Sequence, residues 1–173
     1  CIIILFSNTI SAKGYDVISF GLYDIEKWEL AGEQSDEAYD YRYERRFDYS
    51  LFEIGPEAED FFNLKPFVGI EVTSDEAYYL LGGIYLDDNL GTIFFGDKSS
   101  FILTPSFGAG YYDEGKGKKL GSSIEFRTAL EISYELKNEN RIGLSLSHHS
   151  NANLGDKNPG VETLSISYQF PIK

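Results

Sequence analysis

The chain has 173 residues, a formal net charge of −13, and aromatic side chains at 16% of its positions. This length suits one domain with a full core or a small closed barrel. The acidic balance argues against nucleic acid as a partner, because phosphate binding needs clustered Lys and Arg. The apolar and aromatic content is too high for a disordered chain, and aromatic residues are enriched in strands. The composition therefore favours a folded β protein.

The first residues, 1-CIIILFSNTISAKG-14, form an apolar run that ends in small residues. This pattern predicts that residues 1–12 are the remnant of a secretory signal, with cleavage near Ser11 or Ala12; a structural N-terminal strand is the alternative. Residues 13–173 are then a single domain. Cys1 is the one cysteine, so an internal disulfide is excluded. No apolar run reaches the ~18 residues that a membrane helix needs, so a membrane location requires a barrel.

Alternation with a period of two dominates the rest of the chain. In 122-SSIEFRTALEISYEL-136, one face carries Ile124, Phe126 and Leu130, whereas the other carries Glu125 and Arg127. A helix would scatter these residues around its circumference, but a strand sorts them onto two faces. The pattern therefore predicts strands.

Eight segments share this alternation, and turn-rich pieces separate them. They are residues 15–25, 37–49, 64–74, 77–87, 100–113, 122–136, 140–151 and 160–171. No helix is expected between them. The number, length and spacing of the segments are typical of an up-and-down antiparallel barrel.

Alternation alone does not say which face lies inside the barrel. A soluble, lipocalin-like carrier places apolar residues inward, and an outer-membrane barrel places them outward. The polar faces carry Glu, Arg and Asp together, which can pair across a narrow lumen, and the apolar faces carry the Tyr and Phe of interfacial girdles. We therefore predict an eight-stranded antiparallel transmembrane β-barrel of the bacterial outer membrane. The connections 50–63 and 88–99 are longer than the periplasmic turns of such barrels.

The stretch 146-LSHHSNANLGDKNPGVETLSI-166 holds the candidate site. Counting along the strands places His148 and Ser150 on the apolar, lipid-facing side together with Glu162, and places His149 on the lumen side. The two histidines therefore cannot share a metal ion, and we expect neither a metal nor a cofactor. Ionisable residues on a lipid-facing surface are costly and are functional by default.

This set of side chains predicts a serine hydrolase. Ser150 would be the nucleophile, His148 its base, and Glu162 the carboxylate that orients the imidazole. Asn151, Asn153 and nearby backbone N–H groups are candidates for stabilising the oxyanion. If both termini are periplasmic, the patch lies at the outer leaflet, so its substrate would be an outer-leaflet lipid. A non-enzymatic structural or adhesive barrel is the competing hypothesis.

The motif H-x-S-N-A at 148–152, with residues 158–160 leading to Glu162, resembles the outer-membrane lipid A 3-O-deacylase (PagL-type) or acyloxyacyl hydrolase family. Residues 64–72 and 120–127 are also similar. The resemblance implies hydrolysis of the ester-linked 3-acyl chain of lipid A, within lipopolysaccharide, by a Ser-His-Glu triad. It also assigns Asn151 to the oxyanion site. Asn153 stands where the family has Gly, and His149 where it has an aromatic residue. Two further possibilities stay open. The protein could form a homodimer, and it could be a related lipid esterase that acts on a different substrate.

Overall fold

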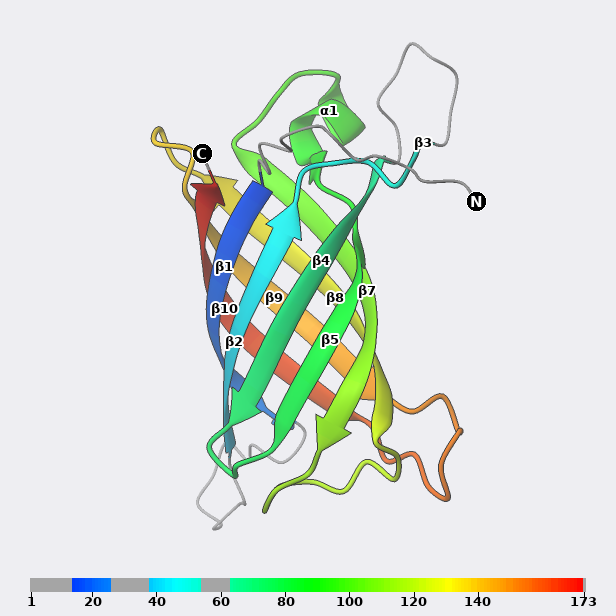
Figure 1. The fold of residues 1–173 in the computed structure, drawn as a ribbon. Helices are drawn as coiled ribbons and strands as arrows, with labels where there is room; N and C mark the ends of the chain where they lie inside the picture. The colour runs from blue at the N-terminus through cyan, green and yellow to red at the C-terminus, as the bar shows by residue number, and fades with distance from the viewer. Residues whose placement is uncertain (1–13, 26–37, 54–62, 173) are drawn as a thin grey trace, which may run out of the picture.

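The computed structural model describes residues 14–25, 38–53 and 63–172, and within them eight long strands close into a barrel (Figure 1). Each strand pairs antiparallel with its chain neighbours, and β1 pairs with β10 to complete the circle. This confirms the predicted fold; the predicted signal remnant at 1–12 lies outside the described residues. The long strands are β1 (Gly14–Tyr23), β2 (Ala38–Phe47), β4 (Asn63–Thr73), β5 (Tyr78–Tyr85), β7 (Phe101–Asp113), β8 (Ile124–Glu135), β9 (Arg141–Ser150) and β10 (Val161–Ile172).

Three short elements lie at the end of the barrel that carries Gly14 and Ile172 (Figure 1). They are β3 (Phe52–Glu53), β6 (Asp88–Asn89) and the helix α1 (Leu90–Phe95). The expectation of no helix was therefore wrong. The side chain of Asn89 accepts hydrogen bonds from two amides of the first turn, and Gly96 ends the helix at φ 76°. These caps hold six residues, too few to produce a helical period in the sequence.

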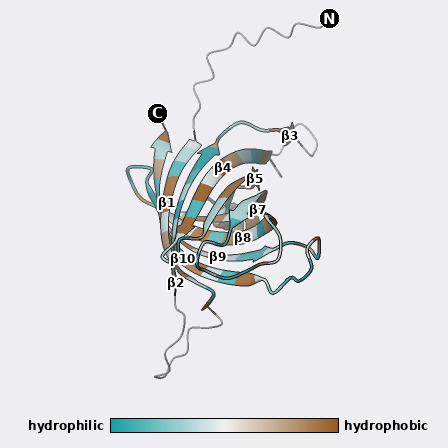
Figure 2. Cartoon of the chain, turned by 60° about the horizontal axis from the view of Figure 1, so that its bottom comes forward, coloured by the Kyte–Doolittle hydropathy of each residue, from teal (hydrophilic) through white to brown (hydrophobic). Residues whose placement is uncertain are grey.

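The barrel wall is polar inside and apolar outside. Ile166 and Leu144 are 63% and 55% exposed on the outer surface, whereas Arg127 on the lumen side is 1% exposed. Hydropathy accordingly alternates along the strands (Figure 2). The soluble-carrier alternative is therefore wrong, because it requires the opposite polarity. No helix of the described residues is long and apolar enough to cross a membrane.

Ion pairs fill the lumen. Arg127 contacts both Glu44 and Glu71, and Arg46 Nη1 lies 2.7 Å from Glu131 Oε1. Gln169 donates to the same Glu131 oxygen at 2.6 Å. Buried charges cost several kcal/mol each unless they are paired and hydrogen-bonded. The interlocked pairs therefore fix which strand faces which across the lumen, and this fixes which residues reach the outer wall.

Candidate active site

His148 and Glu162 meet on the outer surface of the barrel. They stand directly opposite each other on the antiparallel strands β9 and β10. Nδ1 of His148 lies 2.7 Å from Oε1 of Glu162, and the two side chains are 49% and 30% exposed. When the carboxylate accepts the Nδ1 proton of a neutral imidazole, Nε2 carries the lone pair of a base. The arrangement therefore holds the ring in a tautomer suited to proton transfer.

Ser150 is half-buried at the end of β9, two residues beyond His148. Residues two apart on a strand share a face and lie about 7 Å apart along it. Within the described residues, no hydrogen bond joins Ser150 to His148. Hydrogen bonds between a nucleophile and its base are often loose without substrate. Ser150 thus lies on the same face of β9 as the imidazole, two residues along the strand.

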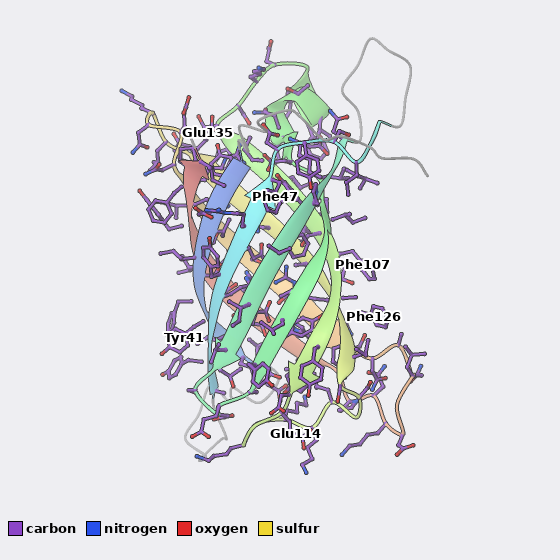
Figure 3. All side chains as sticks on the ribbon, viewed as in Figure 1. Tyr41, Phe47, Phe107, Glu114, Phe126 and Glu135 are labelled. Carbon is purple, nitrogen blue, oxygen red and sulfur yellow. The ribbon has the colours of Figure 1, made fainter. Side chains whose placement is uncertain are left out.

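An aromatic wall borders the serine. Phe126 on β8 is the partner of Ser150 across the sheet. Its ring stacks on that of Phe107, with centroids 6.1 Å apart and an interplanar angle of 15°. Both side chains project outward from the barrel (Figure 3). A lipid chain lying against this wall would pass beside the hydroxyl.

Gly160 supports the imidazole from the side of the β9–β10 loop. Its φ of +65° is in the left-handed region, and a Cβ at this position would lie 2.9 Å from Cε1 of His148. Only glycine therefore combines this backbone conformation with this close approach. No role for Gly160 was predicted from the sequence, although 158-NPG-160 is a turn signal.

Asn151 is fully buried and holds two loops together. Its Nδ2 donates to the carbonyls of Leu120 at 2.9 Å and Lys157 at 2.7 Å, and its backbone N–H donates to Oδ1 of Asn158 at 3.0 Å. Both amide protons and the backbone proton are therefore in use. The geometry makes Asn151 a clamp between the loops rather than a side chain that faces the serine.

The next two residues have the backbone geometry of a tight turn. Ala152 and Asn153 have φ of 51° and 63°, and the turn is closed by a hydrogen bond from Leu154 N to Asn151 O at 2.9 Å. Asn tolerates the left-handed conformation better than other residues with a Cβ. Asn153 therefore keeps the turn that glycine would make. In the described part of the chain, the amides of Ala152 and Asn153 have no acceptor, so both can donate to an oxyanion.

His149 lies on the opposite side of the wall, as predicted. Its Nε2 is 2.9 Å from Oε2 of Glu71, at ion-pair distance but without the alignment of a hydrogen bond. The ring packs edge-on against Tyr79 at 5.3 Å. Among the described residues, no group of three or more His, Cys, Asp or Glu side chains is arranged to hold a metal ion.

A second charged pair, not predicted from the sequence, lies on the outer wall. Arg45 donates from Nε and Nη2 to the two carboxylate oxygens of Asp16, both at 2.8 Å, and Tyr43 donates to the same carboxylate at 2.7 Å. This pair lies toward the opposite end of the barrel from His148. Its bidentate geometry satisfies both charges, and the Asp16 carboxylate is occupied by the guanidinium and by the Tyr43 hydroxyl. Charge on the outer wall is thus not sufficient to define a site; the open imidazole beside a hydroxyl is the distinguishing feature.

Comparisons with known proteins find sequences similar to the part of the chain that holds these residues. The family described as lipid A 3-O-deacylase (PagL) matches residues 90–171. Lipid A deacylase PagL of Bordetella bronchiseptica is 36% identical over 53 residues, which are 31% of this chain and 30% of that protein. The Pseudomonas aeruginosa protein of the same name is 34% identical over 55 residues, 32% of each chain. The matched part thus spans about a third of each of these relatives.

Solved structures match over most of the chain. The crystal structure of the outer membrane enzyme PagL superimposes with a TM-score of 0.64 and 18% identity, covering 91% of this chain and 99% of that one. A designed transmembrane β-barrel gives a TM-score of 0.59 with 9% identity, covering 95% and 98%. These likenesses concern the fold.

The closed barrel, its inverted polarity and the exposed His–Glu pair define an outer-membrane β-barrel with a candidate hydrolase site on its lipid-facing wall. The predicted location in the outer membrane is thereby confirmed, and the orientation of the site toward the outer leaflet stays a prediction. The family match and the two relatives also confirm the resemblance to the lipid A 3-O-deacylase (PagL) family, whose members are hydrolases.

Proposed function

We propose that the protein hydrolyses the ester-linked acyl chain at the 3-position of lipid A, at the outer leaflet of the outer membrane. The observation that carries this proposal is the hydrogen bond between His148 and Glu162 on the lipid-facing wall, with Ser150 on the same face. A lipid ester can approach that wall from within the membrane plane. The names of the matching proteins give lipid A as their substrate, and here the substrate would be lipid A within lipopolysaccharide.

The first half of the reaction transfers the acyl group to the serine. Ser150 Oγ attacks the ester carbonyl carbon while its proton passes to Nε2 of His148. The bond between the carbonyl carbon and the sugar oxygen then breaks, and the imidazolium returns the proton to that oxygen. Glu162 stabilises the imidazolium through the Nδ1 hydrogen bond. The products of this half are an acyl-enzyme and a sugar hydroxyl.

Water completes the reaction. His148 takes a proton from a water molecule, whose oxygen attacks the acyl carbon, and the proton then returns to Ser150 as the fatty acid leaves. The amides of Ala152 and Asn153 are the donors that we assign to the oxyanion, because the N–H groups of Asn151 are used in the loop clamp. Asn151 would then act by holding the turn that presents those two amides.

Mass spectrometry of lipid A from outer membranes containing the wild type or Ser150→Ala tests this proposal. We expect the wild type to release one hydroxyacyl chain and Ser150→Ala to release none. Ser147→Ala is the matched control, because Ser147 is on the same strand but buried on the lumen side. Unchanged lipid A in every sample, with folded protein, would leave an esterase of another substrate or a non-enzymatic barrel. The homodimer stays a prediction, which crosslinking in membranes can test.

A further inference from the structure

Two loops meet directly beside the site. Residues 114–123 join β7 to β8, and residues 151–160 join β9 to β10. Gly121 has φ +97°, and a Cβ on it would lie 2.2 Å from the carbonyl oxygen of Lys157 and 2.9 Å from Cγ of the same residue. The Asn151 amide also links the loops through Leu120. The two loops therefore form one packed layer, and the stem of Lys157 lies on Gly121.

This layer presents lysines although the whole chain has a net charge of −13. Lys118 is 19% exposed and pairs with Asp24 at 2.9 Å, and Lys116 pairs with Glu76. Lys119 differs, because its side chain is 68% exposed and its contact with Glu114 is longer, at 3.3 Å. Lys157 is exposed and forms no ion pair within the described residues. Two ammonium groups are thus available to an anion from outside.

The position of these groups relative to the site is fixed by the clamp. The carbonyl of Lys157 accepts a hydrogen bond from Asn151, the residue next to Ser150. Three residues after Lys157, Gly160 abuts the ring of His148. A lipid whose acyl ester reaches Ser150 would therefore carry its headgroup to the level of this loop layer.

We propose that Lys119 and Lys157 bind a phosphate group on the headgroup of the lipid substrate; this inference rests on the proposed function. Lysine binds phosphate as a point charge, and its flexible stem lets the ammonium follow a mobile headgroup. The carboxylates of Glu114 and Asp156 lie in the same loops as the two lysines. An anion that binds here must therefore compete with Glu114 for Lys119, which favours a strongly charged group such as phosphate. Binding should weaken as salt rises, because exposed charges are screened.

The test measures binding separately from hydrolysis. In a Ser150→Ala background, the double change Lys119→Ala with Lys157→Ala is compared with Lys137→Ala. Lys137 is also exposed but lies in the turn between β8 and β9, at the opposite end of the barrel. The probes are lipid A carrying its phosphates and enzymatically dephosphorylated lipid A, each in detergent micelles. We expect the double variant to bind phosphorylated lipid A about 10-fold more weakly, with Lys137→Ala unchanged. The dephosphorylated lipid should bind equally well to the Ser150→Ala parent, to the double variant and to the Lys137→Ala variant.

Three outcomes would decide against the inference. An equal loss of affinity for both lipids would mean that the lysines shape the loops rather than bind phosphate. No loss of affinity for either lipid would mean that the lysines take no part in recognising the substrate. Full displacement of the lipid by excess inorganic phosphate would assign the site to the free anion. In the active chain, the double variant should raise KM and leave kcat within about twofold. Phosphate-dependent binding without any hydrolysis would reject the proposed esterase and retain the lysine site.

Discussion

Adjacent residues on β9 give the barrel two histidine–glutamate pairs, one on each side of its wall. His148 and Glu162 are 2.7 Å apart outside, with side chains 49% and 30% exposed, and His149 and Glu71 are 2.9 Å apart inside, with side chains 4% and 5% exposed. The residue types and distances are nearly the same. The difference lies in what surrounds each pair.

The inner pair belongs to a closed network, since Glu71 also contacts Arg127 and Arg42. Its imidazole faces an aromatic ring and cannot reach a substrate. The outer imidazole has one nitrogen held by a carboxylate, and its ring is half-exposed on the face that also carries Ser150. A histidine–glutamate pair thus serves structure or chemistry according to the access that its second ring nitrogen has.

Substituting the two histidines one at a time should give the largest difference in deacylation rate. We expect His148→Asn to lower the deacylation rate by about 10⁴-fold or more, because a catalytic unit without its base retains little activity. His149→Asn should keep the rate within about 10-fold, since that ring faces the lumen. Initial rates on purified lipid A in detergent measure both. Equal losses in the two variants would contradict the assignment of His148 as the base.

Substituting the two glutamates should separate an effect on activity from an effect on stability. Glu162→Gln removes the charge that stabilises the imidazolium, so we expect kcat to fall about 10³-fold while folding is unchanged. Glu71→Gln breaks buried ion pairs, which costs about 3–5 kcal/mol. It should therefore lower the temperature at which the folded band is lost in heat-modifiable gel mobility. A Glu162→Gln protein that unfolds early and a Glu71→Gln protein that does not would reverse this comparison.

Period-two alternation was sufficient to predict the eight long strands and the faces of His148, His149, Ser150 and Glu162. Hydropathy along β9 places His148 outward and His149 inward, because successive side chains on a strand point to opposite faces. The sequence could not predict the clamp by Asn151, because its partners Leu120 and Lys157 come from two different loops. The contact of Gly160 with His148 was missed for the same reason. Such contacts depend on loop conformation, which has no period.

Gly160→Ala tests the contact that supports the outer imidazole. The new Cβ would meet Cε1 of His148 at 2.9 Å, so the ring must shift away from its hydrogen bond with Glu162. We expect the rate to fall about 10-fold, since a displacement of about 1 Å costs up to 10²-fold. Gly96→Ala is the control, because Gly96 has φ +76° but nothing within 4 Å of its Cβ position. Any loss shared by both variants would come from the backbone strain alone.

Asn153→Gly should have the smallest effect. Asn153 already holds φ at 63°, so glycine, the residue that the resemblance leads us to expect here, leaves the turn that presents the amides of Ala152 and Asn153 unchanged. We expect kcat/KM within about twofold of wild type, because Asn adopts this conformation at little cost. Asn153→Val should lower the rate, since a β-branched residue at positive φ is strained by about 1–3 kcal/mol. If Asn153→Gly instead raised the rate by an order of magnitude, the asparagine side chain itself would obstruct the oxyanion site. The turn would then be intact, but one of its donors would be covered.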